Sequence, residues 1–321
     1  MVFIPKVSVV VPAYNVSSYI EDALRSLQKQ SFQEFEVLIV DDGSTDNTAE
    51  IVRPFVKSDS RFQLWQKQNG GLSSARNHGI RHARGEYIAL LDGDDVYHSD
   101  KLARHVATLD RYPEIGVVYS ASRAIRDDGK PIPIYLSGKP VHSDPLLALL
   151  CKNFVGHGSN AVFRRSLINE VGEFDESLRS SEDIDFWLRV ATTRKWQFYR
   201  DKRTLCYYRV RPSGLSFNVA QMQRCNEQVI QSAMERSPQL VEPMLPTAYA
   251  YMYRYLARLS LQGGNLDQAS HFINRALACN WSIFYSDPRS LLTLLAVRLA
   301  PLAKLGIRQA LGSVRYTQKQ P

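Results

Sequence analysis

The chain has 321 residues, of which 44% are hydrophobic and 22% charged, a balance typical of folded globular proteins that excludes wholesale disorder. This length allows one catalytic domain of about 200–250 residues and a smaller appendage. The net charge of +8 lies mostly after Asp287, where six basic and no acidic residues leave +2 for residues 1–287, so it does not indicate nucleic-acid binding.

Strand-like and helix-like segments alternate in the N-terminal part of the chain. Short apolar or β-branched runs, typical of buried strands, occupy Val7–Pro12, Phe35–Val40, Phe62–Gln66 and Tyr87–Leu91. Helices are predicted between them, over Ser17–Gln30, from about Asp46 with Ser44 as its cap, and from Gly70 to about Arg84. The alternation predicts an open α/β sheet that binds ligands at the carboxyl ends of its strands.

The pattern becomes mixed beyond about Gly116 and helical from about Val219. Strand signals return at Ala161–Phe163 and Gln197–Tyr199, and residues 127–145 are expected to form an exposed loop or hairpin. We therefore expect one domain over residues 1–218. A helical region should follow over 219–321, with an αα-hairpin at 247–281 and a basic, apolar tail at 288–321.

The cysteines and the hydropathy favour a cytoplasmic protein. The four cysteines lie far apart in the sequence and form neither a zinc knuckle nor a disulfide framework. No signal-peptide pattern precedes Val7, and no run reaches about 18 apolar residues, the length that spans a membrane.

Polar clusters follow three of the predicted strands. Pro12-Ala13-Tyr14-Asn15 offers a ring to flank a nucleobase and an amide, although Pro and Asn also favour plain turns. Asp41-Asp42 offers one carboxylate for the fold and one for a base or ribose. Asp92-Gly93-Asp94-Asp95 can present carboxylates to one divalent cation, and Gly93 lets the backbone approach a phosphate. Three such clusters at successive strand ends predict a nucleotide site.

Two further motifs carry charge. Gly70-Gly71 opens a helix and offers N–H groups to an anion, and Arg76 can add a charge-assisted contact. Glu182-Asp183 begins another helix, where one carboxylate can serve as a general base or simply favour the helix dipole. His78 and His82 have the spacing of some zinc ligands, but the arginines around them favour a solvated basic face.

Five motifs in order resemble those of family 2 glycosyltransferases, over roughly residues 5–218. They are VSVVVPAYN, EVLIVDDGSTDNT, NGGLSSARNHGI, GEYIALLDGDD and GEFDESLRSSEDIDFWLR. The resemblance implies a GT-A fold, a mixed sheet with helices on both faces, and transfer of a sugar from a nucleotide-diphosphate donor, usually a UDP-sugar, to an acceptor hydroxyl. It also implies Mn²⁺ or Mg²⁺ as the cofactor.

The same resemblance implies roles for individual residues. Asp183 would be the base of a single inverting displacement, with Glu182 as its neighbour, and Asp94 the principal metal ligand, assisted by Asp92. The nucleotide-sugar would contact a set that follows the motifs: Pro12, Tyr14, Asn15, Asp42, Arg76, Asp92, Gly93 and Arg211.

The sequence departs from the family at two places. Arg211 stands where many members have a His, so a third metal ligand from His is not expected, though Arg211 could touch the diphosphate. The Q-x-x-R-W signature of processive members is absent, which implies a single-addition enzyme.

The C-terminal region and the acceptor leave alternatives open. The tail at Leu291–Ile307 favours equally a membrane-surface anchor and a helix in a homodimer interface. A saccharide or lipid-linked acceptor, in cell-surface polysaccharide or glycolipid synthesis, would suit a peripheral position on the inner face of the membrane. The competing functions are a sugar-1-phosphate nucleotidyltransferase and a non-catalytic scaffold that binds sugar nucleotides.

Overall fold

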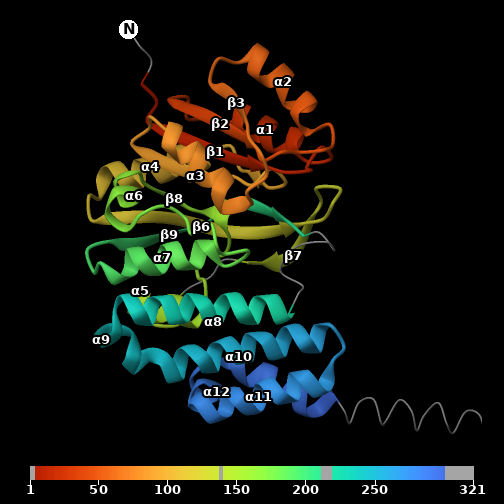
Figure 1. The fold of residues 1–321 in the computed structure, drawn as a ribbon, viewed down its shortest axis with the longest axis vertical. Helices are drawn as coiled ribbons and strands as arrows, with labels where there is room; N and C mark the ends of the chain where they lie inside the picture. Colours follow the sequence, from red (N-terminus) through yellow and green to blue (C-terminus); the bar gives the residue numbers. More distant parts are fainter. Residues whose placement is uncertain (1–3, 137–139, 211–218, 301–321) are drawn as a thin grey trace, which may run out of the picture. The chain divides into compact units, whose positions relative to one another are not determined.

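A computed structural model describes residues 4–136, 140–210 and 219–300 (Figure 1). The chain divides into two compact units. The first comprises residues 1–149 and 153–215, and the second residues 150–152 and 216–321.

The first unit begins with four parallel strands, and these were all predicted. They are β1 (Val7–Ala13), β2 (Phe35–Asp41), β3 (Phe62–Gln66) and β4 (Tyr87–Leu90), in the spatial order β3-β2-β1-β4. Three helices connect them: α1 (Ile20–Gln28), α2 (Thr48–Ser58) and α3 (Leu72–His82). The predicted cap of α2 is wrong: Asp46 Oδ1, not Ser44, accepts bonds from the N–H (3.0 Å) and hydroxyl (2.6 Å) of Thr48.

Helices cover both faces of this sheet because alternate strand residues point to opposite sides. Val9 and Val37 belong to one buried cluster with leucines of α1 and of α4 (Lys101–Arg111). On the other face α3 approaches so closely that a Cβ on Gly79 would lie 2.5 Å from Val10 Cγ1. Gly79 therefore permits the contact between α3 and the sheet.

The rest of the sheet is mixed and was only partly predicted. It continues β4-β8-β6-β9-β5 through β8 (Val162–Arg164), β6 (Ile115–Ile125), β9 (Gln197–Arg209) and β5 (Val96–Tyr97). β6 pairs antiparallel with β8 and parallel with β9, and β7 (Pro131–Tyr135) completes the hairpin expected after residue 127. The unit also contains η1 (Gly158–Asn160), α6 (Ser166–Val171) and α7 (Glu182–Thr192). Helix α5 (Pro145–Cys151) begins in this unit, and its last two residues are assigned to the second.

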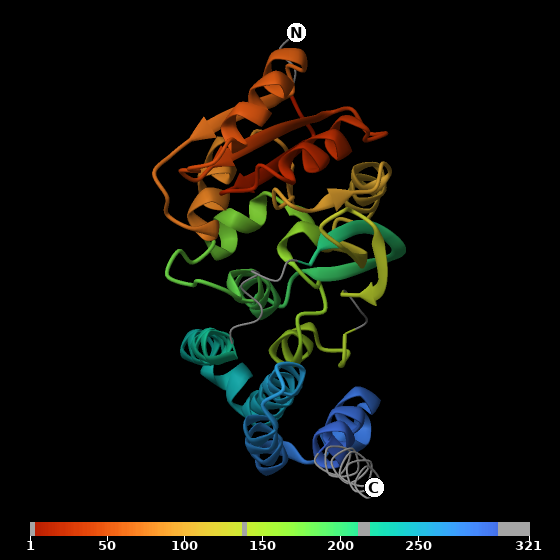
Figure 2. The ribbon, with the colours of Figure 1, turned by 90° about the vertical axis from the view of Figure 1, so that its right-hand side faces the viewer.

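The second unit is helical. Its elements are α8 (Val219–Arg236), α9 (Pro238–Val241), η3 (Glu242–Met244), α10 (Leu245–Gln262), α11 (Leu266–Asn280), α12 (Ile283–Ser286) and a helix over residues 288–300. Helices α10 and α11 pack side by side (Figures 1 and 2), with Tyr253 and Phe272 stacked between them. Asn265 caps α11 by accepting a bond from the Gln268 N–H. Among the described residues no helix is long and apolar enough to cross a membrane.

Candidate functional site

The three polar clusters follow neighbouring strands of the parallel sheet. β1 lies between β2 and β4 in register, so the carboxyl ends of all three strands meet at one edge. The chain runs from β1 to β2 and β3 on one side and returns to β4 on the other, which makes β1/β4 a topological switch point. Ligands of open α/β sheets bind at such points.

The cluster after β1 contains two exposed residues, Tyr14 and Asn15, and the buried Pro12. Tyr14 is 49% exposed, and its ring is accessible to a ligand. Asn15 has a left-handed φ of 51°, and its amide oxygen accepts a bond from the N–H of Thr45 (2.9 Å). Pro12 is buried, and its carbonyl accepts a bond from Gly93 N–H (3.2 Å), which joins this cluster to the acidic loop after β4.

The two aspartates after β2 have separate partners. Asp41 accepts bonds from Ser44 N–H (2.9 Å) and Gln66 (3.1 Å), a role in the fold. Asp42 is buried, and its carboxylate accepts the Gly70 and Gly71 N–H groups and pairs with Lys67 at 2.7 Å. The expectation that these glycines offer free N–H groups to a ligand is therefore wrong, since the Asp42 carboxylate occupies them.

The acidic loop after β4 has two half-buried carboxylates and one that is fully buried. Asp92 and Asp94 are half-buried, whereas Asp95 is fully buried and accepts bonds from Ser159 Oγ (2.6 Å) and Arg209 N–H (2.9 Å). Burial, followed by the charges of Asp94 and Asp92, raises the pKa of Asp95 well above its usual value. Asp95 thus anchors the loop and leaves Asp92 and Asp94 as its candidate ligands.

Arg209, which the sequence did not single out, braces the same loop. Its side chain is fully buried and donates to the Asp94 carbonyl (2.9 Å), to the Asp127 carbonyl (2.6 Å) and to Asp22 (2.9 Å). The predicted diphosphate contact, Arg211, lies outside the described residues.

Arg76 joins the acidic loop to the start of α7. It is 1% exposed, and its guanidinium donates to Asp92 Oδ1 at 2.8 Å and to Glu182 Oε1 at 2.5 Å. Burial alone would lower the pKa of Arg76, but the charges of Asp92 and Glu182 more than offset this and raise it. Gly158 makes room for this cation, since a Cβ there would overlap the guanidinium.

The residue next to Arg76 fixes the segment before α7. Asn77 Nδ2 donates to the Phe174 carbonyl at 2.8 Å, and its Oδ1 accepts the Phe174 N–H at 2.9 Å. Arg76 and Asn77, adjacent on α3, thus hold residues 174–182 against the parallel half of the sheet. This explains how Glu182 comes to share a cation with Asp92.

Asp183 is a buried carboxyl with the pKa of a neutral-pH base. Its Oδ2 accepts a bond from Asn153 Nδ2 (2.8 Å), and its Oδ1 accepts the Ile184 N–H (2.8 Å). Burial and the neighbouring Glu182 charge raise its pKa from 3.8 to about 7, against the opposing charge of Arg76. A general base works best with a pKa near the operating pH. Asn153, also missed by the sequence, orients this carboxyl.

The residues at the acidic loop fit a divalent metal bound together with a diphosphate. No group of three or more His, Cys, Asp or Glu side chains in the described part of the chain forms a metal site by itself. Mg²⁺ is commonly held by one or two carboxylates plus substrate phosphates. Asp94 and Asp92 provide such carboxylates, although one oxygen of Asp92 already accepts from Arg76.

His78 and His82 belong to an aromatic stack. The rings of His82 and Trp65 lie 4.0 Å apart, and His78 lies 4.8 Å from His82. Burial and the nearby charges of His82, Lys67 and Arg81 lower the pKa of His78. The predicted solvated face is thus only partly right, because His82 is exposed whereas His78 is half-buried in this stack.

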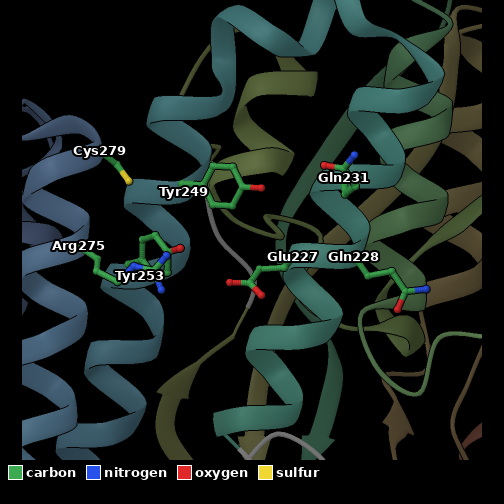
Figure 3. A pocket seen from close by; sticks show the side chains of 7 residues that line it. All are labelled: Glu227, Gln228, Gln231, Tyr249, Tyr253, Arg275 and Cys279. Carbon is green, nitrogen blue, oxygen red and sulfur yellow. The ribbon is translucent and has the colours of Figure 1, made fainter.

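A separate cavity of about 590 Å³ lies within the helical unit (Figure 3). It is bounded by α8, α10 and α11, and Figure 3 shows the Tyr249 ring directed toward α8. Its lining comprises Glu227, Gln228, Gln231, Tyr249, Tyr253, Arg275 and Cys279. All of these residues belong to the second unit, and every described candidate site residue belongs to the first.

Residues 8–172 match the family described as "Glycosyl transferase family 2". Among curated proteins, the chain is 32% identical to an uncharacterized glycosyltransferase, EpsJ, of Bacillus subtilis (strain 168), over 66% of this chain and 63% of EpsJ. It is 29% identical to the chondroitin synthase of Pasteurella multocida (strain Pm70), over 64% of this chain and 21% of the synthase. The chain thus spans less than two thirds of these relatives.

Solved structures share the fold. TarS 1–349 of S. aureus in complex with UDP-GlcNAc has a TM-score of 0.56 at 21% identity, over 86% of this chain and 91% of that one. The mannosyltransferase PcManGT from Pyrobaculum calidifontis, in complex with GDP-Man and Mn²⁺, has a TM-score of 0.61 at 20% identity, over 95% of this chain and 88% of that one. The predicted GT-A fold with a helical C-terminal region is confirmed.

Proposed function

The chain belongs to glycosyl transferase family 2, and from this we propose that it moves a sugar from a nucleotide-diphosphate donor to an acceptor hydroxyl with inversion. Residues 1–218 are the catalytic domain in this proposal, and residues 219–321 a separate helical region. The observation that carries it is the buried Arg76 guanidinium, which binds the metal candidate Asp92 and Glu182, the neighbour of the proposed base Asp183.

The donor occupies the edge where β1, β2 and β4 end. The half-exposed Tyr14 ring flanks the base, and Asp42 is the buried carboxylate beside it. Pro12, Asn15 and Gly93 shape the backbone around the ribose and phosphates, and Asp92 and Arg76 complete the donor site. Arg211 is proposed as a diphosphate contact on sequence alone. We favour a UDP-sugar, and the solved relatives named above hold UDP-GlcNAc in one case and GDP-Man in the other.

Asp94, with Asp92, would hold Mn²⁺ or Mg²⁺ against the diphosphate. When bound, this ion neutralises the charge that develops on the leaving group. Arg209 and Asp95 keep the loop in place for that contact, through the Asp94 carbonyl and the Arg209 N–H.

Asp183 accepts the proton of the acceptor hydroxyl. The hydroxyl oxygen forms a bond to the anomeric carbon while the bond from that carbon to the diphosphate breaks, and the proton moves to a carboxylate oxygen of Asp183. Burial favours this transfer because it raises the proton affinity of the carboxyl. Glu182 is the partner of Arg76, and a single sugar is added per encounter.

For the acceptor we propose a saccharide or a lipid-linked saccharide, in cell-surface polysaccharide or glycolipid synthesis. A peripheral position on the inner face of a membrane would suit such an acceptor, and a homodimer is the alternative use of the C-terminal helices. The exposed leucines of the helical unit fit the position on a membrane.

Release of free nucleotide diphosphate tests the activity. The full chain is incubated with UDP-, GDP- and dTDP-sugars, with Mn²⁺ or with a chelator, and with extracted lipid-linked saccharides as acceptors. We expect release from one donor class, dependent on the metal and absent in Asp183→Asn. Pyrophosphate formed from a sugar-1-phosphate and a nucleoside triphosphate would instead reveal a nucleotidyltransferase, and donor binding without turnover would reveal a scaffold.

A further inference from the structure

The helix over residues 288–300 turns four of its five leucines outward. Its buried positions are Ser290, Thr293 and Val297, which recur at the spacing of one helix face. Its exposed large side chains are Leu291, Leu292, Leu295 and Leu299, and Leu292 is 65% exposed. A surface helix of a soluble protein normally shows the reverse arrangement. The leucine face therefore has no partner among the described residues.

Two aromatic side chains just before this helix are also exposed. Trp281 is 70% and Tyr285 is 92% exposed, whereas Ile283 and Phe284 between them are buried. Trp and Tyr are enriched where an apolar phase meets water, because each ring has an apolar body and a polar group. The exposed leucines and these two rings together are called the leucine–aromatic face.

The charge of the surrounding sequence selects the partner. Arg289 and Arg298 are exposed on the same helix as the leucines. After Asp287 the sequence contains no acidic residue, and its basic residues are Arg289, Arg298, Lys304, Arg308, Arg315 and Lys319. A second copy of the chain would bring like charges together around this face, whereas an anionic surface would complement them.

We propose that the leucine–aromatic face binds the surface of an anionic lipid membrane. The leucines enter the boundary between headgroups and acyl chains, Trp281 and Tyr285 lie at headgroup level, and the arginines contact anionic headgroups. The helix lies along the membrane and does not cross it. This binding deepens the acceptor side of the proposed function but is independent of Asp183 and of the donor, so each proposal can fail without the other.

Flotation of the full chain with vesicles tests the proposal. The vesicles contain phosphatidylcholine alone or with phosphatidylglycerol, and lipid-bound protein is measured in the floating fraction. We expect binding to the anionic vesicles only, weakened by high salt. The variant L292S/L295S/L299S should reduce it at least about tenfold, and Arg289→Glu should reduce it less.

The matched control removes exposed apolar side chains elsewhere. I134S/Y199S/L240S changes three exposed residues outside the face, and its flotation should equal that of the original chain. Circular dichroism melting checks that all variants fold, and Trp281→Ala provides a second, single-residue variant with reduced binding.

Four results would overturn the proposal. The first is no flotation of the original chain with anionic vesicles, and the second is equal flotation of the leucine variant. The third is a dimer, measured by light scattering, that the leucine variant dissociates while lipid binding is absent. The fourth is loss of thermal stability in that variant without lipid binding, which would show that the chain itself covers the face.

Discussion

The candidate site of the first unit and the last described helix of the second place charged and apolar side chains in opposite ways. In the first, Arg76 and Arg209 are buried, and their guanidinium groups donate to carboxylates and to backbone carbonyls. In the second, the last described helix buries Ser290 and Thr293 and exposes its leucines. Buried charges must be compensated by partners, and exposed leucines gain from a partner outside the unit. The contrast agrees with both proposals, catalysis by the first unit and membrane binding by the second.

Asp183→Asn gives the largest expected effect. An amide cannot accept the acceptor proton, so kcat should fall about 10²–10⁴-fold, while donor affinity should stay nearly unchanged. Steady-state rates and donor titration measure the two quantities. An unchanged kcat would show that Asp183 is not the base, and the catalytic role proposed for the first unit would then lack its proton acceptor.

Arg76→Met should destabilise the first unit by about 3–5 kcal/mol, because the buried Glu182 and the half-buried Asp92 would both lose their shared cation. Chemical denaturation measures the free energy of unfolding. Arg298→Met, at an exposed arginine of the helical unit, is the matched control and should change it by less than about 0.5 kcal/mol. Equal effects of the two variants would contradict the difference between the units.

The pKa of Asp183 also predicts how stability depends on pH. Its folded value of about 7 exceeds the ordinary 3.8, so between these values the folded chain holds a proton that the unfolded chain has lost. This contribution to stability is full below about pH 4 and is lost as pH rises through about 7. Asp183→Asn should therefore melt above the original chain at about pH 8, with the difference vanishing near pH 4. A difference in melting temperature that grows as the pH falls would have the opposite sign and would contradict a raised pKa of Asp183.

Gly158→Ala should disturb Arg76 and cost about 1–3 kcal/mol, since its Cβ would overlap the guanidinium. Gly263→Ala in the helical unit is the control, because the atoms nearest its Cβ lie at 3.5 Å and 3.6 Å. Melting temperatures compare the two variants. An unchanged melting temperature of Gly158→Ala would show that the Arg76 side chain can adopt another conformation.

Asn153→Ala has the smallest expected effect, a loss of about fivefold in kcat, corresponding to one hydrogen bond. Because this bond stabilises the charged carboxylate, its removal should raise the pKa of Asp183 and move the acidic limb of the kcat/KM profile to higher pH. A lower rate with an unmoved profile would give Asn153 only a structural role. Asn153→Ser, which can still donate, should restore part of the shift.

The sequence predicted those features that lie in short local motifs. The parallel strands and their terminal aspartates were found because apolar runs and turn residues alternate within a few positions. Asn153, Gly158 and Arg209 were missed because each acts on a residue far along the chain. The long strand β6 lacked a signal, since Ser120 and Ser122 interrupt its apolar run and are buried by pairing with later elements.

The helix over residues 288–300 also shows what the sequence alone could not predict. Its composition suggested both a membrane anchor and a dimer helix, but the sequence could not tell which face would be buried. Burial of Ser290 and Thr293 depends on packing in the second unit, and only this packing reveals that the leucines face outward.

Thermal unfolding with nucleotides tests the donor site at Asp94 most directly. The full chain and Asp94→Asn are melted with UDP-, GDP- and dTDP-sugars, with and without Mn²⁺. A ligand at about 100 times its dissociation constant stabilises by roughly 2.7 kcal/mol, a shift of a few degrees. We expect this shift with one nucleotide class, only with metal, and not in Asp94→Asn. An equal shift in Asp94→Asn, or none with any nucleotide in the original chain, would contradict the proposed metal-dependent donor site.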